Sequence, residues 1–93
     1  IWMYMNFHLN FKRLLKLNSP VKLEQQLKYL TYITETVAPD DPLPMYFCGY
    51  LQRKVLGVID PALLSRLEVT VNSSEYWGNC FKHFNLSVSQ LVS

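Results

Sequence analysis

The stretch MYFCGYLQRKVLGVI, residues 45–59, decides the fold that we expect for this chain. Its first part, 45–51, is apolar and aromatic, and three polar residues at 52–54 separate it from a second apolar run at 55–59. Two apolar runs joined by a short polar segment are typical of a β-hairpin. We therefore predict strands over 45–51 and 55–59, with a bulge or a close backbone approach at Gly57.

The residues before this hairpin predict a helix followed by a loop. Ser19 and Pro20 have the form of a helix start, a capping hydroxyl and then proline at the first helical position. The helix ends either near Thr34 or earlier, passing into a short strand over 32–37 that is rich in β-branched and aromatic residues. Three prolines within 38–44 fix the backbone φ angles there, which predicts a loop. The apolar stripe of the helix would consist of Leu23, Leu27, Leu30 and Ile33.

The residues after the hairpin predict further short helices. Asp60 and Pro61 repeat the start signal. Residues 68–71 are expected to be extended or irregular, and 72–75 offers another cap. Residues 86–92 would form either a fourth short helix or frayed apolar chain. The helix that starts at Asp60 and Pro61 would have an inner face made of Leu63, Leu64 and Leu67. The helix capped within 72–75 would have an inner face made of Trp77, Cys80, Phe81 and Phe84.

The N-terminal residues 1–11 alternate between strictly apolar and mixed positions, which indicates a half-buried strand or a hairpin bent near Asn6. Together the patterns predict an α+β fold in which short antiparallel hairpins pack with three or four helices. With 93 residues the chain is one small domain or a piece of a longer polypeptide. Its ends, Ile1 and Ser93, favour the second interpretation.

Composition limits the classes of function. The hydrophobic content of 49% is high for so small a unit, so we expect part of the surface to face neighbouring protein. A net charge of +2 is not by itself a nucleic-acid footprint. Cys48 and Cys80 are the only cysteines, and we interpret them as free thiols in a reducing, cytoplasmic setting. No apolar run reaches the ~18 residues of a transmembrane helix.

No pattern in the sequence carries catalysis or metal binding. His8 and His83 have no partner at metal-ligand spacing. Asp40 and Asp41 lie in the proline-rich segment, where adjacent aspartates are usually solvated turn formers. We predict no catalytic residue, no metal ligand and no cofactor in this segment. Most aromatic residues lie on predicted inner faces, and Tyr50 is the most plausible exception.

The order of Phe47-Cys48-Gly49, a returning strand, Asp60-Pro61 and the leucine-rich run 63–67 resembles a known family. It is similar to the end of the palm and the start of the thumb in RNA-dependent RNA polymerases of plus-strand RNA viruses, in the alphavirus-like, tobamovirus-like group. In that family Phe-Cys-Gly opens the motif E hairpin, and the helix from Pro20 with its following strand would correspond to motif D. The resemblance covers about 19–67 and implies a palm-like segment 1–59 and a thumb-like start at 60–93.

This resemblance implies part of an RNA-directed RNA polymerase, a nucleotidyltransferase of viral RNA replication. The fragment would supply the primer grip and would not be catalytic alone. The implied RNA- and primer-binding residues are Cys48, Gly49 and Tyr50 near the growing 3′ end, and Arg53 and Lys54 at phosphate. The implied partners are the RNA template and primer and the rest of the replicase in the host cytoplasm. The parent enzyme would need Mg²⁺.

The chain departs from the family at one place. The metal-binding Gly-Asp-Asp would fall near Met5-Asn6-Phe7-His8, and no acidic pair is present there. Asn, Phe and His do not replace two carboxylates for a hard cation. Two alternatives therefore stay open: a non-enzymatic interaction or structural module, which includes a degenerate viral remnant, and an unrelated α+β domain.

Overall fold

The computed structural model describes residues 20–92, and this part of the chain is a packed set of helices without a strand. The predicted N-terminal strand or hairpin at 1–11 lies outside the described residues. The prediction of an α+β fold with an antiparallel hairpin at 45–59 is wrong. The elements in chain order are α2 (Pro20–Tyr32), the π-helical turn η1 (Ile33–Val37), α3 (Pro42–Leu56), α4 (Pro61–Asn72), α5 (Glu75–His83) and the 3₁₀ turn η2 (Val88–Leu91).

Helix α3 covers the first predicted strand, the predicted turn and residues 55–56, and residues 57–60 connect it to α4. It begins at a cap of the same form as the one that the sequence shows at Asp60 and Pro61. The Asp41 side chain accepts a hydrogen bond from the Leu43 backbone N–H at 3.0 Å. Pro42 and Pro44 lie in the first turn, where the helix does not use backbone N–H groups as donors. The predicted loop over 38–44 is therefore confined to 38–41.

The end of α3 explains the glycine that the hairpin prediction assigned to a bulge. Gly57 has φ 83°, the left-handed conformation typical of helix C-caps, and its N–H donates to the Arg53 carbonyl at 3.0 Å. The apolar run before it lacks a clear helical period because the helix is buried nearly all round: residues 42–49 and 51 are all buried. A short apolar run of this kind does not by itself distinguish a strand from a buried helix.

The two glycines of this region should respond in opposite directions to alanine. Gly57→Ala forces a left-handed conformation on an L-residue and should lower the free energy of unfolding by about 1–2 kcal/mol. Gly49→Ala lies inside α3, where the added Cβ meets Leu91 Cδ1 at 3.4 Å, an ordinary contact. It should be neutral or should raise the free energy of unfolding by up to about 1 kcal/mol. Urea denaturation of the two variants measures both values; the same sign for both would contradict the helix.

The predicted short strand at 32–37 is also wrong, because α2 runs directly into the π-helical turn η1. The Ala38 N–H donates to the Ile33 carbonyl at 2.8 Å, which closes a wider ring than an α-helix has. The buried Thr34 side chain donates to the Thr31 carbonyl at 3.0 Å, so its hydroxyl is paired within the helix.

The predicted stripe of α2 is confirmed: Leu23, Leu30 and Ile33 are buried and Leu27 packs against the core.

The start of α4 is confirmed as predicted. The Asp60 carboxylate accepts from the Ala62 N–H at 3.0 Å, with Pro61 at the first helical position. Leu63 and Leu67 are buried and Leu64 packs beside them. The helix continues to Asn72, so the prediction of an extended or irregular segment at 68–71 is wrong.

Helix α5 and the turn η2 complete the described chain. The Ser74 hydroxyl caps α5 by accepting from the Trp77 N–H at 3.2 Å, which confirms the cap expected within 72–75. Phe81 is buried, and the other three predicted inner residues pack against the core. The predicted fourth short helix is the 3₁₀ turn η2, whose Leu91 is buried.

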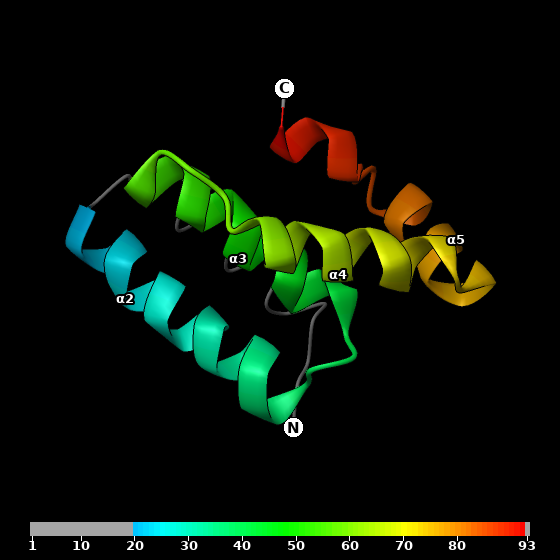
Figure 1. Ribbon diagram of the computed structural model, residues 1–93, viewed down its shortest axis with the longest axis horizontal. Helices are drawn as coiled ribbons and strands as arrows, with labels where there is room; N and C mark the ends of the chain where they lie inside the picture. The colour runs from blue at the N-terminus through cyan, green and yellow to red at the C-terminus, as the bar shows by residue number, and fades with distance from the viewer. Residues whose placement is uncertain (1–19, 93) are drawn as a thin grey trace.

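Helix α3 is the centre of this arrangement. It contacts α2, η1, α4 and η2, and Figure 1 shows α4 crossing it, with α2 on one side and the red η2 on the other. One cluster of buried side chains joins α2, α3, α4, α5 and η2. The boundary at residue 60 between a palm-like and a thumb-like segment stays a prediction.

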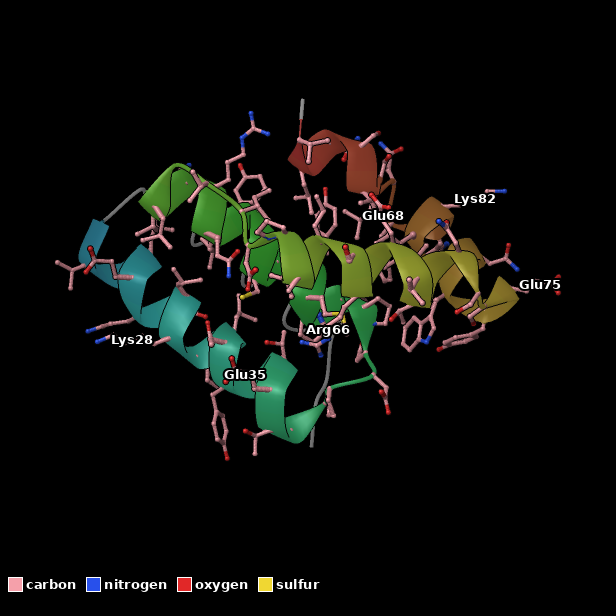
Figure 2. The ribbon with its side chains drawn as sticks, viewed as in Figure 1. Lys28, Glu35, Arg66, Glu68, Glu75 and Lys82 are labelled. Atoms are coloured by element: carbon pink, nitrogen blue, oxygen red, sulfur yellow. The ribbon has the colours of Figure 1, made fainter. Side chains whose placement is uncertain are left out.

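The Arg66 side chain connects α4 to η1 and to the loop that follows η1. Its Nη2 donates to the Thr34 carbonyl at 3.3 Å and to the Pro39 carbonyl at 3.0 Å. Figure 2 shows Arg66 turned from α4 toward the molecule, whereas Lys28 and Glu75 point outward. The Arg66 guanidinium therefore holds the end of η1 and the loop after it, and its role is structural.

Candidate functional site

Two of the five predicted RNA-contact residues are buried. The Cys48 side chain is 2% exposed, and its sulfur lies 3.7 Å from the Thr31 hydroxyl and 3.9 Å from Gln52 Nε2. Gly49 is buried where the side chain of Leu91 approaches α3. The close approach that we expected at this glycine is thus made by a leucine of the same chain. A ligand at the surface does not reach either residue in this fold.

The structure brings the other three together on one face of α3. Tyr50, Arg53 and Lys54 stand at helical positions i, i+3 and i+4, which are neighbours on a helix surface. They line one depression of about 360 Å³, together with Gln90 and Leu91. Arg53 and Lys54 are exposed, and Tyr50 is half-buried. We call this set the α3 cluster: Tyr50, Arg53 and Lys54.

The turn η2 forms the second wall of the depression. The Tyr46 hydroxyl donates to Gln90 Oε1 at 3.1 Å, and the Arg53 guanidinium Nη1 donates to the Leu91 carbonyl. Buried Leu91 anchors the turn against α3. Gln90 and Leu91 were missed as site residues because no local pattern connects them with residues some 40 positions earlier. Their place follows from the packing of Leu91 at Gly49.

The chemistry of the α3 cluster suits an anion with an adjoining flat ring. A guanidinium presents planar N–H donors that match phosphate, and an ammonium adds a flexible point charge. A tyrosine ring offers a face on which a base can stack. Among the described residues, no carboxylate, histidine, serine or cysteine lines the depression. The α3 cluster can bind and orient an anionic ligand.

The acidic residues of the described chain do not gather into a cation site. Over residues 20–92 no three His, Cys, Asp or Glu side chains stand close enough to hold a metal ion together. Asp41 and Asp60 each cap a helix through a carboxylate oxygen. Asp40 is exposed in the loop before α3, and His83 is exposed on α5. The Mg²⁺ expected for the parent enzyme therefore finds no fitting ligand set in this part of the chain.

Three buried or partly buried groups have shifted acidities. Burial raises the pKa of the Cys48 thiol above 9.0, and hydrogen bonding from Thr31 opposes the shift in part. Burial also raises the pKa of Cys80, and Asp41 adds to that rise. The Tyr46 pKa is raised above 10.0 by burial and then by Tyr50. All three groups are neutral at pH 7, which fits packing roles and gives no thiolate nucleophile.

The raised pKa of Cys48 predicts a pH dependence of stability. In the unfolded chain this thiol ionises near its ordinary pKa, whereas in the folded chain it stays protonated to higher pH. The unfolded state therefore binds fewer protons above about pH 9, and stability falls as pH rises from there. Cys48→Ala should flatten this fall above about pH 9. Urea denaturation at several pH values measures the slope, and an unchanged slope would contradict the assignment.

No protein-family model, no curated protein and no solved structure matches this chain. Among residues 20–92, none of the helices combines the length and the hydropathy that crossing a bilayer requires.

Proposed function

We propose that this chain contributes RNA contacts, and no reaction centre, to an RNA-directed RNA polymerase of a plus-strand RNA virus. The observation that carries the proposal is the gathering of Tyr50, Arg53 and Lys54 around one depression on α3. These are the members of the set assigned by the family resemblance to primer and RNA that are not buried. The Leu-rich helix that begins at Asp60 and Pro61 agrees with the thumb start in that resemblance. The primer-grip hairpin is not part of the proposal.

The expected binding is weak and salt-dependent. Two cations that each neutralise one phosphate of a single strand give a slope of log K against log salt of about −1.4. Stacking of one base on the Tyr50 ring would add about 1–3 kcal/mol, largely independent of the base. Affinity for RNA in the complete polymerase would then come from several such contacts. This chain would supply one of them.

Charge reversal tests the proposal directly. Binding of a fluorescein-labelled single-stranded RNA of about 12 nucleotides is followed by anisotropy at low salt, where phosphate contacts weigh most. Arg53→Glu combined with Lys54→Glu should weaken binding about tenfold or more, since it removes two phosphate contacts and adds repulsion. Tyr50→Leu keeps an apolar side chain but removes the ring, and should weaken binding about fivefold or more.

A matched control separates a site from general attraction. Lys22→Glu combined with Lys28→Glu changes the net charge equally, on exposed positions of α2. Figure 2 shows Lys28 pointing away from the body of the molecule. This control should weaken binding by no more than about threefold, through long-range attraction alone. Equal losses in the two double variants, or no RNA binding by the unaltered chain, would overturn the proposal, and circular dichroism verifies that each variant keeps its helices.

A further inference from the structure

A polar groove adjoins the turn η2 next to the depression of the α3 cluster. It has a volume of about 670 Å³ and is lined by residues 71–75, 78–79, 81–82 and 86–89. The depression is lined by Gln90 and Leu91, the next two residues of the chain. At about 2 Å per residue of a 3₁₀ turn, the backbone from Ser87 to Leu91 spans about 8 Å. A single strand of about four nucleotides, at about 3.4 Å each, is therefore long enough to contact both hollows.

The side chains of the polar groove are mainly hydroxyls and amides. Four of the five serines within residues 20–92 line it: Ser73, Ser74, Ser87 and Ser89. Asn72 and Asn79 add two exposed amides. Among its described residues the one aromatic side chain is Phe81, which is buried. The groove thus offers hydrogen bonds, whereas the ring face for a base lies at Tyr50.

Hydrogen bonds within the chain leave part of these hydroxyls available. Ser74 Oγ accepts the Trp77 N–H, and a hydroxyl that accepts keeps its own O–H as a donor. Ser87 and Ser89 share one hydrogen bond of 2.7 Å, which uses one of their two O–H groups. With the amides, the groove presents both donors and acceptors, which is what a ligand hydroxyl requires because it also donates and accepts.

Two opposite charges stand at the ends of the groove. Glu75 and Lys82 are seven residues apart, about two turns of α5, and both line it. Figure 2 shows them at the two ends of α5. They are the only Asp, Glu, Lys, Arg or His among the described residues of the lining, so the groove has no net charge. Its middle therefore suits a neutral polar group, with a phosphate placed toward Lys82 and away from Glu75.

We propose that the polar groove binds a ribose of RNA through its 2′-hydroxyl and so distinguishes RNA from DNA. This inference rests on the proposed function, because the strand is the one whose phosphate and base the α3 cluster contacts. Serine and asparagine side chains are ordinary contacts to the sugar–phosphate backbone. The 2′-hydroxyl, a donor and an acceptor, is the group by which a protein distinguishes RNA from DNA at a given site.

Oligomers that differ only at the 2′ position test the inference on the full chain. Fluorescein-labelled 12-mers of uridine and of 2′-deoxyuridine have the same bases and the same charge, and anisotropy at low salt measures their binding. The uridine 12-mer should bind at least about fivefold more tightly, since the deoxy oligomer leaves the hydrogen bonds of the groove unmade. Equal binding of the two would overturn the ribose contact and leave the α3 cluster in place.

One double substitution and its matched control locate the sugar preference. Asn79→Ala combined with Ser87→Ala removes an amide and a hydroxyl from two walls of the groove, and should weaken uridine binding to the level of the deoxy oligomer. Binding of the deoxy oligomer should stay within about twofold. Gln25→Ala combined with Ser65→Ala makes the same kind of change at exposed positions of α2 and α4, and should keep the preference. A preference that survives the first variant, or is lost equally in both, would overturn the ribose contact.

The charge-reversal variant separates a failure of the groove from a failure of the α3 cluster. Arg53→Glu combined with Lys54→Glu should weaken both oligomers by the same factor, because their phosphates are identical. A loss no larger than that of the Lys22 and Lys28 control would overturn the proposed function and the inference that rests on it. Circular dichroism verifies that each variant keeps its helices.

Discussion

Replacing Gln52 by proline should lower the free energy of unfolding by about 3 kcal/mol or more. Gln52 lies inside α3, which runs from Pro42 to Leu56. Proline there removes the N–H that an α-helix donates to the carbonyl four residues earlier, and its ring clashes with that carbonyl. In an isolated chain of this size such a loss is a large part of the total stability. Urea denaturation followed by circular dichroism at 222 nm measures the change.

Gln52→Ala is the control for this prediction. Gln52 Oε1 accepts the Asp60 N–H at 2.9 Å, and Gln52 Nε2 donates weakly to the Cys48 sulfur at 3.9 Å, so removal of the side chain loses both. Alanine is the best helix former, and the net cost should be about 1 kcal/mol or less. In a hairpin, residues 52–54 would form the turn, where proline is common. A Gln52→Pro variant as stable as Gln52→Ala would therefore contradict the helix.

Replacing Leu51 by alanine should lower the free energy of unfolding by about 2–5 kcal/mol. The Leu51 side chain is 0% exposed and belongs to the buried cluster that joins the helices. Truncation removes buried methyl groups and leaves a cavity that the neighbouring helices fill only in part. The same urea titration measures this variant.

Val69→Ala serves as the comparison for Leu51→Ala. Its side chain is 66% exposed on α4, and the change should stay within about 0.5 kcal/mol. If Leu51→Ala is no more costly than Val69→Ala, then α3 is not the centre of the core. If Val69→Ala also lowers the free energy of unfolding strongly, then Val69 is buried and α4 packs with a different face against the core.

The parts of the fold that could be predicted from the sequence are those with a local signal. Asp60 with Pro61, and Ser74, have cap chemistry that acts within three residues, and both begin helices as expected. Asp41 with Pro42 carries the same signal. The three prolines of 38–44 nevertheless predict a loop, and this prediction is wrong at 42–44. Prolines in the first turn of a helix are tolerated, and their number alone does not indicate a loop.

The remainder of the fold depends on contacts between residues far apart in the sequence. Gly49 argues against a helix interior on propensity alone, yet Leu91 packs at this position of α3. The aromatic and β-branched residues of 45–51 indicated a strand because they match the composition of one. Burial of α3 among four neighbouring elements overrides that preference and hides the helical period. No single-segment pattern contains this information.

The candidate site was predicted only in part. The resemblance implies Tyr50, Arg53 and Lys54 as RNA contacts, and they lie together because a helix makes positions i, i+3 and i+4 neighbours. The same resemblance implies Cys48 and Gly49, which are buried. The second wall of the depression is formed by Gln90 and Leu91. Their position depends on how η2 packs against α3, and the residues of 45–59 contain no pattern that predicts it.

The central claim is that residues 42–56 form one helix at the centre of the fold, with the α3 cluster on its surface. Backbone NMR of the uniformly labelled chain tests it most directly, through the ¹³Cα secondary shifts and amide contacts of residues 45–59. We expect positive ¹³Cα shifts and sequential amide–amide contacts from Met45 to Leu56, with an interruption at Gly57. Negative shifts at 45–51 and 55–59, with cross-strand contacts between these two segments, would contradict it.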